Sequence, residues 1–244
     1  MAPNILVICG PTASGKTALA VELALLLGGE VVSADSMQIY RGMDIGTAKP
    51  TPEEMRGIPH HMLDVADPEE DFSVARYVEL AAPCVDDILA RGKLPIVAGG
   101  TGLYLDSLLS GRTFAPFSPD GGLRARLEAR FDALGGEAML GELAAADPEA
   151  AVRLHPNDRK RIVRALEVFQ QTGKTISQHN RETRALPLRY DALTLSLAFQ
   201  RREDMWARID RRVDEMMAAG LAEEVRALLD SGVPVRCTAM QAIG

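Results

Sequence analysis

Residues 4–17, NILVICGPTASGKT, decide the fold of this chain. The first six residues form a short apolar run typical of a buried strand. The last eight fit the pattern G-x-x-x-x-G-K-[ST], and an apolar helix is expected directly after them, over Ala18–Leu27, ending at Gly28. A strand, a glycine-rich turn and a helix N-terminus in this order form an anion site in parallel α/β proteins. The sequence therefore predicts a bound di- or triphosphate and leaves the reaction open.

The loop residues have separate expected roles. The glycines let successive backbone amides point at one anion, and the helix dipole adds positive potential there. Lys16 is expected to neutralise phosphate oxygens, and the Thr17 hydroxyl to ligate Mg²⁺, the one cofactor that the sequence implies. The candidate phosphate ligands are Gly10, Pro11, Thr12, Ala13, Ser14, Gly15, Lys16 and Thr17.

The strand–turn–helix pattern recurs along the first half of the chain. Strands are expected over Glu30–Ala34 and Leu94–Ala98. Helices are expected from Ser73, as N-cap, through Arg91, and from the Gly99–Gly102 turn to Gly111. Pro83 is expected to kink or split the first of these helices. This alternation predicts an α/β fold, a parallel sheet like that of the phosphate-loop NTPases with helices on both faces.

The pattern changes around Phe114–Gly122, where prolines and glycines interrupt it and only helical segments follow. Strand and helix patterns return after Pro187. The sequence therefore predicts an α/β core of residues 1–118 and 189–244, interrupted by a smaller all-helical insertion domain of residues 119–188. The expected later elements are helices at Leu123–Leu134, Glu137–Ala145, Pro148–Leu154 and Asp158–Gln171 (N-cap Asn157), a strand at Leu193–Phe199, and helices at Arg202–Ala219 and Leu221–Leu229.

The composition is that of an ordinary globular protein. The 244 residues are 47% hydrophobic and 25% charged, which excludes a disordered, collagen-like or disulfide-stapled chain. The three widely spaced cysteines predict a cytoplasmic, reduced protein without structural zinc. No apolar stretch approaches the roughly 20 residues of a membrane span, so no membrane association is expected. Nothing in the sequence demands more than a monomer.

Charge is distributed unevenly. Residues 153–189 contain nine basic and three acidic residues, a net charge of +6, so the remainder carries −13 of the total of −7. A basic island in an acidic protein is typical of a surface that binds a polyanion such as nucleic acid. A solvated helix with charge pairs four residues apart is the alternative, and the counts alone favour neither.

Two side chains at predicted strand ends are candidates for chemistry. Asp35 follows the second strand, at the sheet edge where ligands bind in doubly wound folds. It could organise a metal, act as a general base, or cap the turn Ser36–Gln38. Thr101 follows the third strand and has the same ambiguity, with a helix N-cap as its plainest role.

Other motifs of nucleotide hydrolases are missing. The third strand ends in glycine, where a strand that holds Mg²⁺ would end in aspartate, and no N-K-x-D motif follows. The pair His60-His61 has no further histidine or cysteine at ligand spacing, which favours a structural or hydrogen-bonding role.

Five segments together resemble the tRNA dimethylallyltransferases, also called tRNA isopentenyltransferases. They are GPTASGKT (10–17), SADSMQIY (33–40), RGMDIGTAKP (41–50), GGTGLY (99–104) and HPNDRKRIVRALEVF (155–169). The resemblance implies transfer of the dimethylallyl group from dimethylallyl diphosphate to N6 of the adenosine 3′-adjacent to the tRNA anticodon, with release of diphosphate. It also implies a core that continues beyond Gly244.

The resemblance implies roles for individual residues. The catalytic set would be Asp35 as general base with Thr101, Lys16 and Arg212, the last joining the loop on the diphosphate. The nucleotide pocket would be lined by Asp35, Ser36, Met37, Gln38 and Thr101. The tRNA anticodon arm would face Arg124, Lys160, Arg161, Ile162, Val163 and Arg164, which resolves the role of the basic island in favour of RNA.

Two other functions share these features. A small-molecule or nucleotide kinase would use the same loop and sheet, but phosphate would appear on its product. A non-catalytic RNA-binding module would use the loop for an anion only and would be indifferent to Asp35→Asn.

Overall fold

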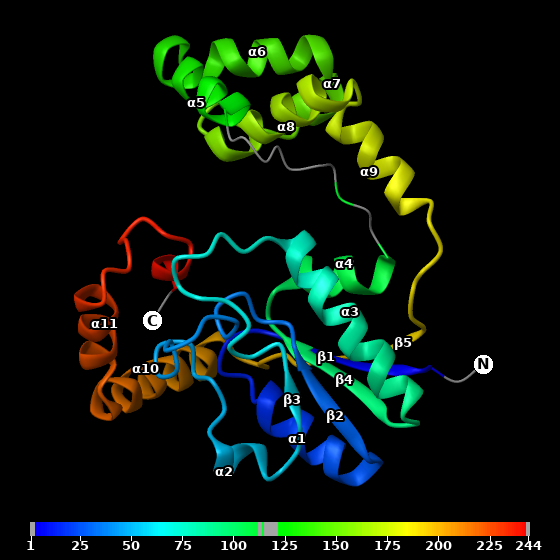
Figure 1. Cartoon of the computed structure of the whole chain (residues 1–244), viewed down its shortest axis with the longest axis vertical. Coiled ribbons are helices and arrows are strands. Elements are labelled where there is room, and N and C mark those ends of the chain that lie inside the picture. Colours follow the sequence, from blue (N-terminus) through cyan, green and yellow to red (C-terminus); the bar gives the residue numbers. More distant parts are fainter. Residues whose placement is uncertain (1–2, 112–113, 115–121, 243–244) are drawn as a thin grey trace. The chain divides into compact units, whose positions relative to one another are not determined.

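The structure is a computed structural model that describes residues 3–111, 114 and 122–242 (Figure 1). Its sheet has five strands in the order β3-β2-β4-β1-β5, and every neighbouring pair is parallel. Because the strands are parallel, the loop after β1 lies at the edge of the sheet where the strands have their carboxyl ends. Because β1 lies between β4 and β5, this loop lies next to the ends of both of these strands. The strands are β1 Ile5–Cys9, β2 Gly29–Ser33, β3 His60–His61, β4 Leu94–Gly99 and β5 Ala192–Ser196.

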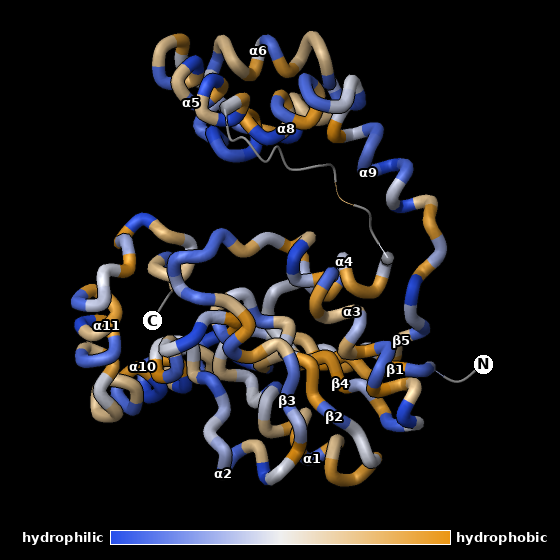
Figure 2. Tube along the Cα trace, viewed as in Figure 1, coloured by the Kyte–Doolittle hydropathy of each residue, from blue (hydrophilic) through white to orange (hydrophobic). Residues whose placement is uncertain are grey.

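Helices cover both faces of this sheet, which confirms the predicted fold class. On one face Ile5 and Val7 pack with residues of α3 (Val74–Ala90) and α4 (Gly102–Ser110). On the other face Leu6 and Ile8 pack with α1 (Lys16–Leu27). Strands buried on both faces read as largely apolar runs, and Figure 2 shows such a run along β4.

Two stacked tyrosines fix the helices next to the carboxyl end of β2. The rings of Tyr77 on α3 and Tyr104 on α4 lie 4.1 Å apart between centroids. The Tyr77 hydroxyl donates a hydrogen bond to the Ser33 carbonyl at 3.0 Å. This hydrogen bond anchors the last residue of β2, two positions before Asp35.

Several expectations about individual elements need correction. Pro83 lies inside α3 without splitting it, because the helix buries apolar residues on both sides of the proline, Ala81 and Val85 among them. The short helix α2 (Pro52–Met55) was not expected, although Thr51 and Glu54 form a capping box there. The strand β3 and the 3₁₀ turn η1 (Ala239–Gln241) are also additions to the predicted fold.

Two helices that follow β5 agree with the sequence. They are α10 (Arg202–Ala219) and α11 (Leu221–Asp230), separated by Gly220 in a left-handed conformation with φ +103°. Ser73 is the N-cap of α3, as expected, since its hydroxyl accepts a hydrogen bond from the Arg76 amide.

The chain divides into two compact units, one of Met1–Gly111 with Leu188–Gly244 and one of Arg112–Pro187. The expected first boundary, between residues 118 and 119, lies outside the described residues. The second unit is helical and packs around Leu127, Met139, Leu143, Ile162 and Leu166. Its helices are α5 Gly122–Leu134, α6 Gly136–Ala146, α7 Pro148–Ala151, α8 Arg159–Thr172 and α9 Ile176–Arg184.

Two details of this helical unit differ from the expectation. The N-cap of α8 is Asp158, one residue later than Asn157. The helix α9 was not expected, because its sequence is polar and lacks an apolar stripe. A buried carboxylate compensates: Asp147 accepts hydrogen bonds from the amides of Ala150 on α7 and Ser177 on α9, at 3.1 and 3.0 Å.

Replacing Asp147 by alanine is expected to destabilise the helical unit by about 1–3 kcal/mol, because two buried amides lose their acceptor. Burial alone would raise the pKa of Asp147, but the hydrogen bonds from Ser177 and Ala150 bring it below its ordinary value. The stabilisation is therefore present at neutral pH and declines as the pH falls below about 4. Urea unfolding followed by circular dichroism measures both effects.

The matched control is Asp132→Ala, which removes only an exposed ion pair with Arg159. A change of a few tenths of a kcal/mol is expected there. Equal effects of the two substitutions would contradict the role of Asp147.

Candidate active site

The predicted phosphate loop lies between β1 and α1. Gly10, at its start, cannot carry a side chain, because an added Cβ would lie 2.7 Å from the Leu197 carbonyl oxygen. Gly15 is the N-cap residue of α1 with φ +89°, and no side chain caps the helix there. The first amides of α1 are therefore left for an anion, as the loop motif predicts.

Lys16 folds back over its own loop. Its Nζ donates hydrogen bonds to the carbonyls of Gly10 and Pro11, at 3.0 and 2.7 Å. Burial lowers the pKa of the Lys16 ammonium below its ordinary value; the nearby Asp35 carboxylate opposes this shift and the Arg212 guanidinium adds to it. Two other predicted catalytic side chains, Asp35 and Arg212, thus lie within electrostatic reach of Lys16, although they come from separate parts of the chain.

The hydroxyls of Ser14 and Thr17 have no hydrogen-bond partner among the described residues. Ser14 Oγ is buried without a hydrogen bond among the described residues. The Thr17 hydroxyl likewise makes none within the described part of the chain, and it is half-buried. Buried polar groups are normally satisfied, so the Ser14 hydroxyl points to a ligand with oxygen atoms in this loop.

Asp35 directly follows β2 and holds the next turn. Its Oδ1 accepts hydrogen bonds from the amides of Met37 and Gln38, at 2.8 and 3.4 Å. The turn-capping role that the sequence left open is therefore present. No hydrogen bond joins Oδ2 to the described residues, and this oxygen remains available for a proton.

Thr101 lies beside this turn. Its Oγ1 accepts a hydrogen bond from the Ser36 amide at 3.1 Å and donates one to Ser36 Oγ at 3.3 Å. It occupies the N-cap position of α4 but makes no capping hydrogen bond there. An added Cβ on the preceding Gly100 would lie 3.9 Å from Lys16 Nζ, so the Gly99–Gly102 turn borders the phosphate loop.

Helix α10 brings two arginines to the loop. Arg212 is one of them, and its charge affects Lys16 as described above. The other, Arg208, donates a hydrogen bond to the Ala13 carbonyl at 3.5 Å and lies over the Phe199 ring, 5.6 Å from its centroid. Sequence reasoning missed Arg208, although its spacing of four residues from Arg212 places both on one helix face.

The residues predicted to face the tRNA anticodon arm all belong to the helical unit and divide into three kinds. Arg124 and Arg164 form ion pairs with Glu167, at 3.0 and 2.8 Å, and Glu167 is only 1% exposed. Lys160 and Arg161 are exposed at the start of α8 and have no ion pair among the described residues. The charges of Arg124 and Arg164 are therefore used within the helical unit, whereas those of Lys160 and Arg161 are not paired among the described residues.

Ile162 and Val163 are the third kind, and here the expectation changes. Both side chains are buried in the core of the helical unit, 0% and 2% exposed. They are core residues of an amphipathic helix, and their side chains are not exposed for contact with RNA.

Much of the basic island is neutralised by acidic residues, several of which lie outside it. The explanation by charge pairs therefore holds for part of the island, since the pairs include one of three residues' spacing within α8 and one of four residues' spacing at the end of α7. The pairs are Arg153 and Arg181 with Glu149, Arg159 with Asp132, Arg164 with Glu167, Lys174 with Glu182, and Arg189 with Asp86.

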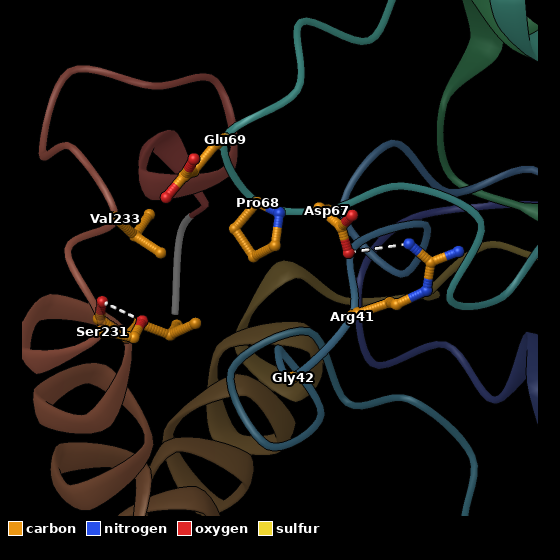
Figure 3. A pocket seen from close by; sticks show the side chains of 8 residues that line it. Arg41, Gly42, Asp67, Pro68, Glu69, Ser231 and Val233 are labelled. Carbon is orange, nitrogen blue, oxygen red and sulfur yellow. Dashed lines mark hydrogen bonds and ion pairs between the residues drawn. The ribbon is translucent and has the colours of Figure 1, made fainter.

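One further hollow lies in the α/β unit, between α11 and the segments around Arg41 and Asp67 (Figure 3). It has a volume of about 510 Å³. Arg41 and Asp67 form an ion pair of 2.7 Å on its wall. None of the predicted catalytic residues lines it. The lining residues are Arg41, Gly42, Asp67, Pro68, Glu69, Leu228, Ser231 and Val233.

The histidine pair has the structural role that the sequence favoured. His61 bonds the buried Glu30 through Nε2 at 2.8 Å, and His60 Nδ1 lies 2.8 Å from the Ile58 carbonyl. Among the described residues, no cluster of three or more histidine, cysteine or acidic side chains could hold a metal ion by itself. No helix in the described part of the chain combines the length and hydropathy needed to cross a bilayer.

The fold and the loop define a phosphate-loop α/β protein with a helical insertion. Comparison with known proteins is more specific. The profile of the IPP transferase family matches residues 38–244, and that of isopentenyl transferase matches residues 3–70. The chain belongs to the IPP transferase family.

Named relatives and solved structures agree. The chain is 52% identical to tRNA dimethylallyltransferase 1 of Trichlorobacter lovleyi, covering 100% of this chain and 79% of the relative. It is 48% identical to the tRNA dimethylallyltransferase of Acetivibrio thermocellus, with coverages of 99% and 77%.

Among solved structures, the tRNA isopentenylpyrophosphate transferase of Bacillus halodurans has a TM-score of 0.67 and 42% identity, with 99% of this chain and 75% of that chain covered. A eukaryotic dimethylallyltransferase described as acting on tRNA has a TM-score of 0.82 and 32% identity, with coverages of 98% and 59%.

Proposed function

We propose that this protein transfers the dimethylallyl group of dimethylallyl diphosphate to N6 of the adenosine that follows the tRNA anticodon on its 3′ side, releasing diphosphate. The observation that carries the proposal is the meeting of an anion-binding loop with a carboxylate: the charge of Asp35 acts on Lys16 within the loop. Membership of the IPP transferase family supports the same reaction.

The loop side of the site is suited to a diphosphate leaving group. As the bond between the allylic carbon and oxygen breaks, negative charge grows on the diphosphate. Lys16, Arg212 and the uncapped amides at the start of α1 stabilise this charge more in the transition state than before it. Arg208 adds a third cation beside the loop.

The loop also fits a magnesium ion bound together with the diphosphate. Mg²⁺ usually takes few protein oxygens and keeps phosphate and water as its other ligands. The Thr17 hydroxyl would supply such an oxygen, which agrees with the lack of an acidic cluster among the described residues. When bound, the ion supplies additional positive charge to the diphosphate. We propose that Thr17 holds it.

Asp35 is suited to act as the base. The N6 amino group of adenine is a weak nucleophile, because its lone pair is delocalised into the ring, and removal of a proton as the N–C bond forms increases its reactivity. The amides of Met37 and Gln38 fix Oδ1 of Asp35, which leaves Oδ2 to accept that proton. We propose that Ser36, Met37, Gln38 and Thr101 line the pocket of the extruded base.

The helical unit would bind the tRNA anticodon arm through phosphates. Lys160 and Arg161 are the exposed charges at the start of α8, whereas Arg124 and Arg164 share the buried Glu167. A loop nucleotide leaves its stack more easily than a paired one, which suits an anticodon-loop target. We also propose a monomeric cytoplasmic protein; its three free cysteines are typical of a reducing compartment.

The decisive experiment incubates the protein with dimethylallyl diphosphate labelled in the allyl group, Mg²⁺ and unmodified tRNA. Label is expected in the RNA, on the adenosine next to the anticodon, with diphosphate released in equal amount. A phosphorylated product from ATP would instead establish the kinase alternative, and absence of both products would contradict the proposed reaction.

Replacing both Lys160 and Arg161 by alanine is expected to weaken tRNA binding and to flatten its salt dependence. The slope of log K against log salt falls by roughly 0.7–0.9 for each phosphate that is no longer neutralised by the protein. Filter binding over a range of salt concentrations measures it. Arg164 is left in place, since its removal would deprive the buried Glu167 of an ion-pair partner.

The control for this pair is the double substitution of Arg130 and Arg153, which removes the same charge from the same unit. Both of these arginines already form ion pairs, with Glu142 and Glu149. Salt slopes that change equally in the two double variants would contradict a specific surface at Lys160 and Arg161.

A further inference from the structure

A carboxylate on helix α11 is bound by three successive backbone amides of a distant loop. Glu224 on α11 accepts hydrogen bonds through Oε2 from Asp44 and Ile45, both at 2.8 Å, and through Oε1 from Gly46 at 2.9 Å. Hydrogen bonds to an ionised group are short and strong. Such a cradle of amides normally binds a free anion, and here α11 supplies it.

The close approach of α11 leaves little room for a side chain at Gly46 in this loop. An added Cβ at Gly46 would lie 3.1 Å from Leu221 Cδ1 and 3.5 Å from Glu224 Oε1. Both Gly46 and Glu224 therefore contribute to this contact, although they are 178 residues apart in the chain. The loop cannot shift without breaking all three hydrogen bonds.

The residues that follow in the same loop bind the side chain of Gln38. Gln38 Nε2 donates hydrogen bonds to the carbonyls of Thr47 and Ala48, at 3.3 and 3.1 Å. Gln38 Oε1 accepts a hydrogen bond from Ser33 Oγ at 3.1 Å. Both amide hydrogens are thus used, and the spare capacity of this half-buried side chain is that of an acceptor at Oε1.

These hydrogen bonds form one continuous path from α11 to the turn that Asp35 caps. Glu224 fixes residues 44–46, residues 47–48 immediately follow, and their carbonyls fix the amide of Gln38. The Thr47 hydroxyl closes the loop internally by donating to the Met43 carbonyl at 2.6 Å. Gln38 in turn donates its backbone amide to Asp35.

We propose that Glu224 is a positioning residue for recognition of the acceptor base. By holding residues 44–48, it keeps the Gln38 amide turned so that its hydrogens face the loop and its oxygen faces the base. An acceptor in that place favours a purine with an exocyclic amino group, as in adenosine, over one with a carbonyl, as in inosine. This inference rests on the proposed function.

The test compares binding of two anticodon stem-loop RNAs that differ only in carrying adenosine or inosine at the acceptor position. The unaltered protein is expected to bind the adenosine RNA roughly fivefold more tightly, the size of one hydrogen bond that is made or absent. Glu224→Ala is expected to remove the part of this ratio that Gln38 contributes, whereas the part due to the Asp35 carboxylate, which also accepts from N6, remains. The same variant is also expected to raise KM for tRNA while leaving KM for dimethylallyl diphosphate within about twofold.

Glu223→Ala is the matched control, since Glu223 is the adjacent acidic residue in the first turn of α11 and is exposed. Its base preference should equal that of the unaltered protein. Glu224→Gln keeps the shape of the side chain and one carbonyl acceptor, so its preference for adenosine over inosine should be intermediate. If the alanine variant does not fold, the glutamine variant tests the role of Glu224.

The outcomes separate the two levels of inference. If the unaltered protein transfers label to tRNA, but Glu224→Gln and Glu224→Ala keep the full preference for adenosine, the role of Glu224 is overturned. If the Glu224 variants are less stable but keep the same ratio of adenosine to inosine RNA binding, the role of Glu224 is also overturned, because a purely structural residue would give this result. Failure of the unaltered protein to modify tRNA overturns the proposed function instead.

Discussion

Asp35→Asn is expected to lower kcat by about 10²–10⁴-fold and to leave tRNA affinity near that of the unaltered protein. Asparagine keeps an oxygen at the position of Oδ1, so the amides of Met37 and Gln38 retain their acceptor and the turn keeps its shape. The substitution removes the basicity of the carboxylate. Single-turnover transfer of label, with enzyme in excess over tRNA, measures the chemical step, and filter binding measures the affinity.

Two comparisons isolate this effect. Asp67→Asn removes an exposed carboxylate whose partner is Arg41, and it should leave both quantities unchanged. Asp35→Ala should lower kcat at least as much as Asp35→Asn, and it removes the turn cap as well. A variant Asp35→Asn that loses only tRNA affinity, at full turnover rate, would show that Asp35 binds RNA rather than accepting a proton.

The edge of the sheet could be predicted because its signals are local. A residue that directly follows a strand of a parallel sheet lies at the carboxyl edge of that sheet. Thr101 could be assigned to this edge from the strand and glycines before it, and Asp35 from the end of the second predicted strand. The hydrogen bonds between the two turns were not predictable. The bond from the Ser36 amide to Thr101 joins residues 65 positions apart and depends on the order of β2 and β4 in the sheet.

Helix α9 shows where periodicity fails as a signal. Its buried residues include Ser177 and Thr183, so the buried face is polar and no apolar stripe marks it. The helix is stabilised instead by the cap at Thr175 and by the carboxylate of Asp147, which comes from outside the helix. Thr175 was a usable local signal, because a threonine before a polar helical segment is a typical N-cap.

The basic island illustrates the limit of counting charges. The basic residues outnumber the acidic ones in this segment, but two of the arginines predicted to bind RNA form ion pairs with the buried Glu167. Burial of one side chain depends on how α5 and α8 pack, which the sequence does not state. Glu224 was missed for a related reason: an acidic residue in the first turn of a helix is ordinary there, and its partners lie in a loop near the other end of the chain.

Lys16→Met is expected to lower kcat/KM for dimethylallyl diphosphate by about 10²–10³-fold, the usual effect of removing one group that stabilises charge developing in a transition state. Methionine keeps the length and apolar stem of lysine and removes the charge. Since burial already lowers the pKa of this ammonium, its removal is not expected to destabilise the fold strongly. Steady-state kinetics with varied donor concentration measure the change.

Inhibition by free diphosphate tests the same interaction without chemistry. Lys16 donates to the carbonyls of Gly10 and Pro11, and we expect it to exchange them for phosphate oxygens when diphosphate binds. The inhibition constant for diphosphate should therefore rise in Lys16→Met but not in Arg76→Ala, which removes an exposed cation that pairs with Glu79. tRNA affinity should be the same in both variants. Unchanged donor kinetics and unchanged inhibition in Lys16→Met would mean that the loop does not hold the diphosphate, because no binding arrangement of this loop leaves its only lysine without effect.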